Sequence, residues 1–159
     1  MENKHLTLSY TVCSLAELSA ADRDLAEKAR AACQTSYAPY SKFRVGAAVA
    51  LANGETICGS NQENAAYPSG TCAERCTMFY ANARYPHTPP TAIAIAACNA
   101  QGDFTPSPIT PCGACRQVLL ETETRYGQPL RVLLCGAHEV YIIDSVKELL
   151  PFRFDASSL

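Results

Sequence analysis

The strongest fold signal in the chain is the stretch VGAAVALANGE at residues 45–55. Residues 45–51 are a short, continuous apolar run that stops at turn residues, which predicts a buried strand. Asn53 and Gly54 then supply the strongest short-range hairpin signal, for a two-residue turn in which both positions need positive φ. We therefore expect a return strand over about residues 55–60.

Helices and strands alternate on both sides of this hairpin. Before it, Ser19 suits an N-cap and apolar residues recur at helical spacing, so a helix is expected over about residues 20–33. After it, the predicted order is helix, strand, helix, strand, strand and short helix, over about residues 72–84, 91–98, 113–125, 130–135, 139–143 and 145–150. Because strand–helix–strand connections favour parallel neighbours, this order predicts a three-layer α/β/α fold with a mixed five-stranded sheet.

Length and composition indicate one folded domain and limit its partners. The chain has 159 residues, 48% hydrophobic and 18% charged, which argues against disorder. Residues 1–20 are expected to be an N-terminal extension, either an edge strand or a loose arm, and residues 21–159 a single domain. A net charge of −2 weighs against nucleic-acid binding. No apolar run is long enough to span a membrane, and no secretory signal is present.

Nine cysteines are the unusual feature of the composition. An odd number cannot pair completely within one chain, and disulfide scaffolds are normally shorter, richer in cysteine and secreted. We therefore expect a reducing, cytoplasmic location, with some thiols buried in the core and others binding metal.

Three of the cysteines lie at predicted helix starts. Cys112 and Cys115 form a CxxC motif, which alone indicates either a redox pair or half of a metal site. Cys72 lies at the start of the preceding helix, and helix starts stabilise thiolates through free N–H groups and the positive end of the dipole. Three thiolates around one zinc would leave the fourth position to water, as in catalytic zinc sites. A structural zinc or buried free thiols remain the alternatives.

Charged residues next to Cys72 favour the catalytic interpretation. Glu74 lies two residues after Cys72, where it can approach zinc-bound water without binding the metal, a pattern known from zinc-dependent nucleobase deaminases. Arg75 and the two helix dipoles are candidates to offset the negative charge of three thiolates. The other six cysteines are expected in the core, although Cys76 lies one helical turn from Cys72 and could face the metal.

The chain resembles the cytidine deaminase family, in its small, single-domain, homotetrameric branch. The similarity covers about residues 25–154 and rests on five motifs, which are YSKFRVGAA at 40–48, NQENAAYP at 61–68, CAER at 72–75, PCGACRQ at 111–117 and ELLP at 148–151. It implies hydrolytic deamination of cytidine and deoxycytidine to uridine and deoxyuridine with release of ammonia, as in pyrimidine salvage. It also implies one zinc ion per subunit and a homotetramer. The first twenty residues extend beyond the usual start of this family.

The resemblance also implies roles for individual residues. Zinc would be bound by Cys72, Cys112 and Cys115, with Glu74 as the proton shuttle and Arg75 bonded to the ligand sulfurs. The implied substrate-binding residues are Asn61 and Glu63 on the ribose 3′-hydroxyl, Phe43 on the base, Ala73 through its backbone, and Tyr67 and Phe154 across subunit boundaries.

The residues themselves support the sugar contact in part. Asn61 and Glu63 alternate with Gln62, so both point to one face of an extended segment. An amide and a carboxylate suit a hydroxyl, which both donates and accepts hydrogen bonds. A solvated loop after a strand explains the pair equally well, and ordinary core packing explains Phe43.

Three other functions are compatible with part of the sequence. A sister family with a similar zinc site deaminates the antibiotic blasticidin S, but Asn61 and Glu63 favour a ribose-bearing substrate. A polynucleotide-editing deaminase disagrees with the net charge of −2 and the lack of a basic stripe. A zinc-stabilised module without enzymatic activity leaves Glu74 unexplained.

Overall fold

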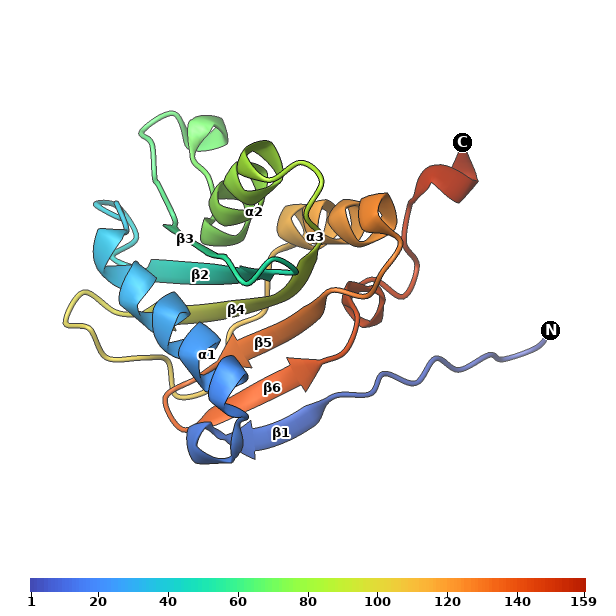
Figure 1. The fold of residues 1–159 in the computed structure, drawn as a ribbon, viewed down its shortest axis with the longest axis horizontal. Helices are drawn as coiled ribbons and strands as arrows, with labels where there is room; N and C mark the ends of the chain where they lie inside the picture. Colours follow the sequence, from blue (N-terminus) through green and yellow to red (C-terminus); the bar gives the residue numbers. More distant parts are fainter.

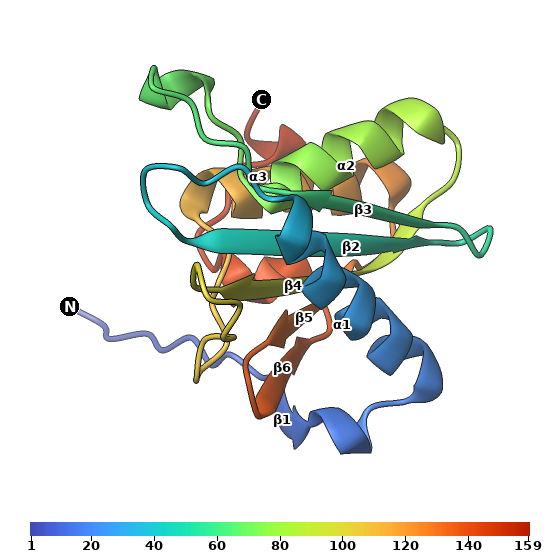
Figure 2. The same cartoon turned by 90° about the vertical axis from the view of Figure 1, so that its left-hand side faces the viewer.

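The computed structural model describes residues 1–159 and confirms the three-layer arrangement (Figure 1). Its strands are β1 (Thr11–Ser14), β2 (Arg44–Leu51), β3 (Thr56–Ser60), β4 (Pro90–Cys98), β5 (Arg131–Cys135) and β6 (Glu139–Ile143). Its α-helices are α1 (Ala20–Ala32), α2 (Ala73–Arg84) and α3 (Gly113–Tyr126). Helix α1 lies on one face of the sheet, and α2 and α3 lie on the other (Figure 2). No helix is long and apolar enough to cross a membrane.

The sheet is mixed, as predicted, but it has six strands rather than five. The strand order is β1-β6-β5-β4-β2-β3, and β4 and β5 are the one parallel pair, connected through α3. The additional strand is β1, which pairs antiparallel with β6 at the edge. Four residues are too few to show a periodicity, and the strand that pairs with β1 lies at the other end of the chain. The sequence therefore left an edge strand and a loose arm equally open.

Alternation along the two central strands divides the core into two layers. In β2 and β4 the odd-numbered residues, such as Val49 and Ile95, pack with α2 and α3. The even-numbered residues, such as Ala48 and Ala94, pack against α1. A strand buried on both faces has a continuous apolar sequence, which is why residues 45–51 do not alternate between polar and apolar.

The hairpin between β2 and β3 forms as expected, but its turn differs from the prediction. Only Gly54 has positive φ, at 86°. The Gly54 amide donates to the Leu51 carbonyl at 3.0 Å, and the Leu51 amide donates to the Glu55 carbonyl at 2.9 Å. The connection is thus a three-residue loop that ends in a left-handed glycine. The Asn53 side chain accepts from the Glu55 amide at 3.1 Å, which stabilises this longer loop.

A close approach at Gly46 places the end of α1 directly over β2. A Cβ atom on Gly46 would lie 2.2 Å from the Ala29 carbonyl oxygen and 2.6 Å from the Cys33 amide nitrogen. Only glycine fits at this distance, since real Cβ atoms do not come under 3.0 Å. The short 3₁₀ turn Cys33–Thr35, and Ser36 after it, are therefore held beside the ends of β2 and β3.

The boundaries of α2 and α3 agree with the predictions to within one residue. Cys72 and Cys112 occupy the two N-cap positions, each with extended backbone. Gly127 ends α3 in the left-handed conformation, with φ 65°. The short helix expected after Ser145 is a 3₁₀ helix, Val146–Leu149, rather than an α-helix.

Candidate metal centre and substrate pocket

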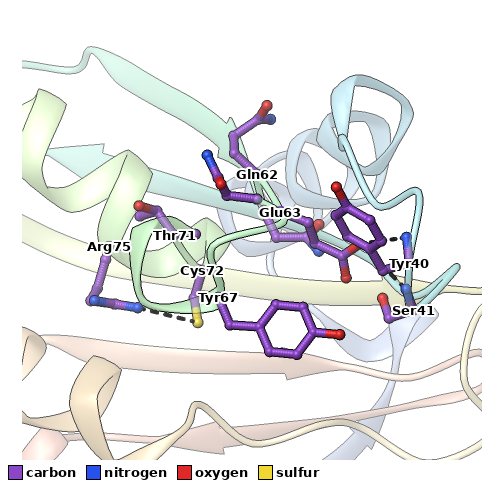
Figure 3. Close-up of a pocket in the computed structure, with 11 residues that line it drawn as sticks. Tyr40, Ser41, Gln62, Glu63, Tyr67, Thr71, Cys72 and Arg75 are labelled. Atoms are coloured by element: carbon purple, nitrogen blue, oxygen red, sulfur yellow. Dashed lines mark hydrogen bonds between the residues drawn. The ribbon is translucent and has the colours of Figure 1, made fainter.

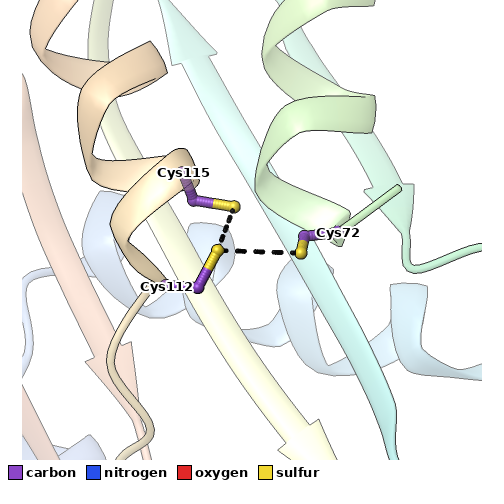
Figure 4. A group of neighbouring side chains, drawn as sticks. All are labelled: Cys72, Cys112 and Cys115. Atoms are coloured by element: carbon purple, nitrogen blue, oxygen red, sulfur yellow. Dashed lines mark hydrogen bonds between the residues drawn. The ribbon is translucent and has the colours of Figure 1, made fainter. Parts of the chain in front are cut away.

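Three cysteine thiols meet where α2 and α3 begin. The Sγ atom of Cys112 lies 3.9 Å from that of Cys72 and 3.4 Å from that of Cys115 (Figure 4). All three sulfurs lie within 4.8 Å of one another. Around a tetrahedral zinc with Zn–S bonds of about 2.3 Å, neighbouring sulfurs are about 3.8 Å apart. The three sulfurs therefore have the spacing of a zinc site.

The electrostatics of the cluster also fit a divalent cation. The Cys115 side chain hydrogen-bonds to Cys72 and lowers its pKa to about 5, with a further contribution from Arg75. The same contact raises the pKa of Cys115, and burial raises it further. In the absence of a cation, Cys72 therefore ionises more readily than Cys115. A bound cation favours the thiolate form of every sulfur that it contacts, and soft sulfur donors suit Zn²⁺.

Glu74 lies in the first turn of α2, directly after the cysteine that caps the helix. Only 4% of the residue is exposed. Burial raises the pKa of its carboxyl, and the neighbouring charge of Cys72 acts in the same direction. A buried carboxyl with a raised pKa can hold a proton nearer to neutral pH and pass it on, which suits proton transfer.

Arg75 lies against the same cluster. Its Nη2 atom is 3.7 Å from the Sγ atom of Cys72 (Figure 3). The Nε atom is buried and has no hydrogen-bond partner. The guanidinium therefore lies where its positive charge can offset negative charge on the Cys72 sulfur.

A pocket of about 550 Å³ adjoins the cluster. Figure 3 shows Cys72 and Arg75 toward one end of its lining and Tyr40 and Ser41 toward the other. The residues that line it are Tyr40, Ser41, Asn61, Gln62, Glu63, Asn64, Tyr67, Gly70, Thr71, Cys72 and Arg75. Five of the predicted site residues are among them, namely Asn61, Glu63, Tyr67, Cys72 and Arg75.

Three predicted substrate residues do not line this pocket. Phe43 precedes β2 and is 40% exposed. Ala73 is fully buried at the start of α2. Phe154 is 59% exposed in the C-terminal segment, where its carbonyl accepts from the Gln117 side chain at 2.9 Å. A single chain does not bring these residues together around the pocket.

A pair of backbone hydrogen bonds was missed by the sequence analysis. The Gln62 amide donates to the Thr71 carbonyl, and the Thr71 amide donates to the Gln62 carbonyl, both at 2.9 Å. This isolated bridge connects the segment of Asn61 and Glu63 to the residue before Cys72. One residue pair outside any strand carries no periodic signal, so no pattern in the sequence indicates it.

The remaining six cysteines follow the expectation in part. Cys33, Cys98 and Cys135 are buried, and Cys13 and Cys76 are half-buried. Cys58 is exposed on β3, so its assignment to the core was wrong. A small residue in an edge strand leaves both outcomes open at the sequence level. Cys76 does not belong to the group of sulfurs that could hold a metal ion.

The fold and the site together define a class of protein, the zinc-dependent deaminases. Residues 19–126 match the family model for the cytidine and deoxycytidylate deaminase zinc-binding region, and the chain belongs to this family.

Curated relatives and solved structures agree with this assignment. A cytidine deaminase from Halalkalibacterium halodurans is 37% identical over 85% of this chain and 95% of the relative. The crystal structure of cytidine deaminase from Burkholderia pseudomallei matches with a TM-score of 0.68 and 39% identity, over 82% of this chain and 97% of that one. The corresponding protein from Mycobacterium leprae matches with a TM-score of 0.60 and 34% identity, over 84% and 98%.

Proposed function

We propose that this chain is a zinc-dependent cytidine deaminase, which converts cytidine and deoxycytidine to uridine and deoxyuridine and releases ammonia. The observation that carries this proposal is the three-thiol cluster, with the buried Glu74 beside it, next to a pocket lined by Asn61 and Glu63. Membership of the zinc-binding deaminase family, and relatives named cytidine deaminase, point to the same reaction.

Cys72, Cys112 and Cys115 would hold the zinc ion, one per subunit. Bound there, zinc supplies Lewis-acid activation of a water molecule. Arg75 donates toward the Cys72 sulfur and offsets part of the negative charge of three thiolates. The N-termini of α2 and α3 contribute in the same direction, because both thiols at the N-caps lie at the positive ends of helix dipoles.

Glu74 is the proton shuttle of the proposed mechanism. It accepts a proton from the attacking water and delivers it to N3 of the pyrimidine, which makes C4 more electrophilic. The water oxygen becomes bonded to C4, and Glu74 then takes the remaining proton from this oxygen and carries it to the amino group. The C4–N bond breaks to release ammonia, and the oxygen forms the C4=O bond of the product. The raised pKa of the buried carboxyl favours this repeated uptake and release of protons.

Substrate binding is assigned to residues around the pocket. Asn61 and Glu63 would hold a ribose hydroxyl, Phe43 would pack on the base, and the backbone of Ala73 would contact the pyrimidine edge. The first two line the pocket, which supports their part of this assignment.

We also infer that the active site is completed by assembly into a homotetramer. Tyr67 and Phe154 would then reach sites across subunit boundaries. Their exposed fractions, 79% and 59%, are high for aromatic residues, which supports burial in an interface. A cytoplasmic role in pyrimidine salvage is consistent with the reaction and with nine free cysteines. We also propose a division into an N-terminal extension (residues 1–20) and a deaminase domain (residues 21–159); the family match spans residues 19–126.

The fall in ultraviolet absorbance of cytidine tests the proposal. Zinc-loaded protein should produce this fall, a chelator should abolish it, and added zinc should restore it. Free cytosine and blasticidin S, assayed in parallel, test the requirement for the sugar. Turnover of blasticidin S without turnover of cytidine would assign the chain to the sister family, and no turnover of any substrate would overturn the proposal.

A further inference from the structure

Two backbone groups fix the orientation of the Asn61 side-chain amide, that is, the positions of its Oδ1 and Nδ2 atoms. The Val45 amide nitrogen lies 2.8 Å from Oδ1 and can only donate, so Oδ1 is the acceptor. The Phe43 carbonyl lies 3.0 Å from Nδ2 and can only accept, so Nδ2 is the donor. The orientation of the amide therefore follows from its neighbours, because a flipped amide would oppose like groups at both contacts.

Ser36 occupies the remaining acceptor position of this amide. Its Oγ atom lies 2.5 Å from Oδ1 of Asn61 and must donate, because Oδ1 has no hydrogen. Oδ1 has two lone pairs, and the Val45 amide and the Ser36 hydroxyl use both. Nδ2 has two hydrogens, of which the Phe43 carbonyl takes one. The second hydrogen is the one hydrogen-bonding group of Asn61 that remains for a ligand in the pocket.

Glu63 has the complementary polarity. Its Oε2 atom accepts from the Tyr40 amide at 2.9 Å and from the Ser41 amide at 3.3 Å. Hydrogen bonds from the Ser41 side chain and the Tyr40 backbone hold the pKa of Glu63 below its usual value, so the carboxylate stays ionised and accepts only. Asn61 thus offers one donor to the pocket and Glu63 offers an acceptor. A hydroxyl, which accepts and donates at one atom, satisfies both.

The position of Ser36 depends on the packing of α1 against the sheet. Ser36 follows the 3₁₀ turn Cys33–Thr35, which the close approach at Gly46 holds beside β2. Its amide donates to the Cys33 carbonyl at 3.2 Å. The neighbouring Thr35 hydroxyl lies 2.8 Å from Oγ of Ser60 and makes no hydrogen bond to Asn61. The hydroxyl of Ser36 is therefore carried on a rigid turn rather than on a free loop.

We propose that Ser36 is a positioning residue for substrate binding: its hydroxyl occupies Oδ1 of Asn61, so that Asn61 acts only as a donor to a sugar hydroxyl. This inference rests on the proposed function, in which Asn61 and Glu63 hold the ribose 3′-hydroxyl. It adds that the selectivity for a hydroxyl at that position depends on a residue that does not touch the substrate.

Binding of uridine and 3′-deoxyuridine to the zinc-loaded protein tests this role by calorimetry, without turnover. Ser36→Ala should weaken uridine binding by about three- to tenfold, the range for one hydrogen bond in such a site. Binding of 3′-deoxyuridine should change by less than about twofold, because that ligand lacks the group that Asn61 holds. In kinetics, kcat/KM for cytidine relative to 3′-deoxycytidine should fall by the same factor as the binding ratio.

Three further variants separate positioning from a structural effect. Ser36→Thr keeps the hydroxyl and should restore the selectivity. Thr35→Ala removes the neighbouring hydroxyl and should leave the uridine to 3′-deoxyuridine ratio unchanged. Ser36→Cys keeps the approximate size of the side chain but replaces the hydroxyl with a weak hydrogen-bond donor, so it should lose the selectivity for uridine over 3′-deoxyuridine. This variant provides the test if Ser36→Ala does not fold.

Different results would overturn the role of Ser36 and the proposed function. An unchanged ratio in a folded, zinc-loaded Ser36→Ala protein, or an equal loss for both ligands, overturns the role of Ser36. Equal binding of uridine and 3′-deoxyuridine to the unmodified protein overturns it as well, because Asn61 and Glu63 then hold no hydroxyl. Absence of cytidine turnover in the unmodified protein overturns the proposed function instead.

Discussion

Replacing Glu123 with alanine should destabilise the domain strongly, because this buried carboxylate connects three segments. Glu123 is 3% exposed and lies near the C-terminal end of α3. Its Oε2 atom accepts from the Leu130 amide at 3.1 Å and from the Val146 amide at 3.0 Å. Its Oε1 atom accepts from the Ser145 hydroxyl at 2.8 Å. The carboxylate thereby attaches the start of β5 and the 3₁₀ helix Val146–Leu149 to α3.

The loss in the free energy of unfolding is set by the backbone N–H groups that would lose their hydrogen-bond acceptor. Leu130 and Val146 are 1% and 0% exposed, so Glu123→Ala leaves two backbone N–H groups buried without an acceptor. Each such group costs about 1–3 kcal/mol, which gives a loss of about 4 kcal/mol in the free energy of unfolding. The ion pair with Lys147, at 3.5 Å, adds little because the lysine side chain is 51% exposed. For a domain of this size, a loss of about 4 kcal/mol lowers the Tm by about 8–16 °C.

Differential scanning calorimetry at fixed protein and zinc concentrations measures this effect. Glu121→Ala is the matched control, since Glu121 is exposed on the same helix. It should change the Tm by only a small fraction of the Glu123→Ala effect, because exposed substitutions stay within about 0.5 kcal/mol. Similar Tm values for the two variants would refute the hydrogen-bond accounting for Glu123.

Three further predictions concern the site and the packing that supports it. Glu74→Gln should retain zinc but lower turnover by about 10²–10⁴-fold, and near-normal deamination of cytidine would contradict its role as proton shuttle. Cys112→Ala should lose zinc and stability together, because metal binding is coupled to folding, and an unchanged zinc-to-protein ratio would contradict its assignment as a ligand. Gly46→Ala should lower the free energy of unfolding by about 1–3 kcal/mol or more, since its Cβ would overlap the Ala29 carbonyl. A wild-type Tm for that variant would show that α1 can move away from β2 at little cost.

Most secondary structure could be predicted because the responsible signals are local. The start of α1 follows from the Ser19 cap, whose side chain accepts from the Asp22 amide at 3.1 Å. The end of α3 follows from Gly127. In contrast, β1 gains its structure from β6, and the β2–β3 loop gains a third residue from the geometry of the two strands it joins. Neither feature produces a pattern in a short stretch of sequence, because both depend on how strands pair.

The candidate site was predictable to a different degree in its two halves. The spacing of Cys112 and Cys115, with Cys72 and Glu74 upstream, was enough to predict a zinc-dependent deaminase, and the fold and the family comparison confirm that class. The sugar-binding half was ambiguous, since alternating polar residues occur in many solvated loops. Phe43, Ala73 and Phe154, assigned only through the resemblance, do not line the pocket of a single chain.

The sequence by itself determined the chemistry that the chain can carry: three thiols and a carboxylate at helix starts, because residue types and caps are local properties. Only the tertiary structure decided how these groups act together. It brings the Sγ atom of Cys72 to 3.9 Å from that of Cys112. It also fixes the side-chain amide of Asn61 through hydrogen bonds from Val45 and Ser36. These contacts join segments that are distant along the chain, and they exist because the packing of α1, α2 and α3 on one sheet leaves each segment a single position.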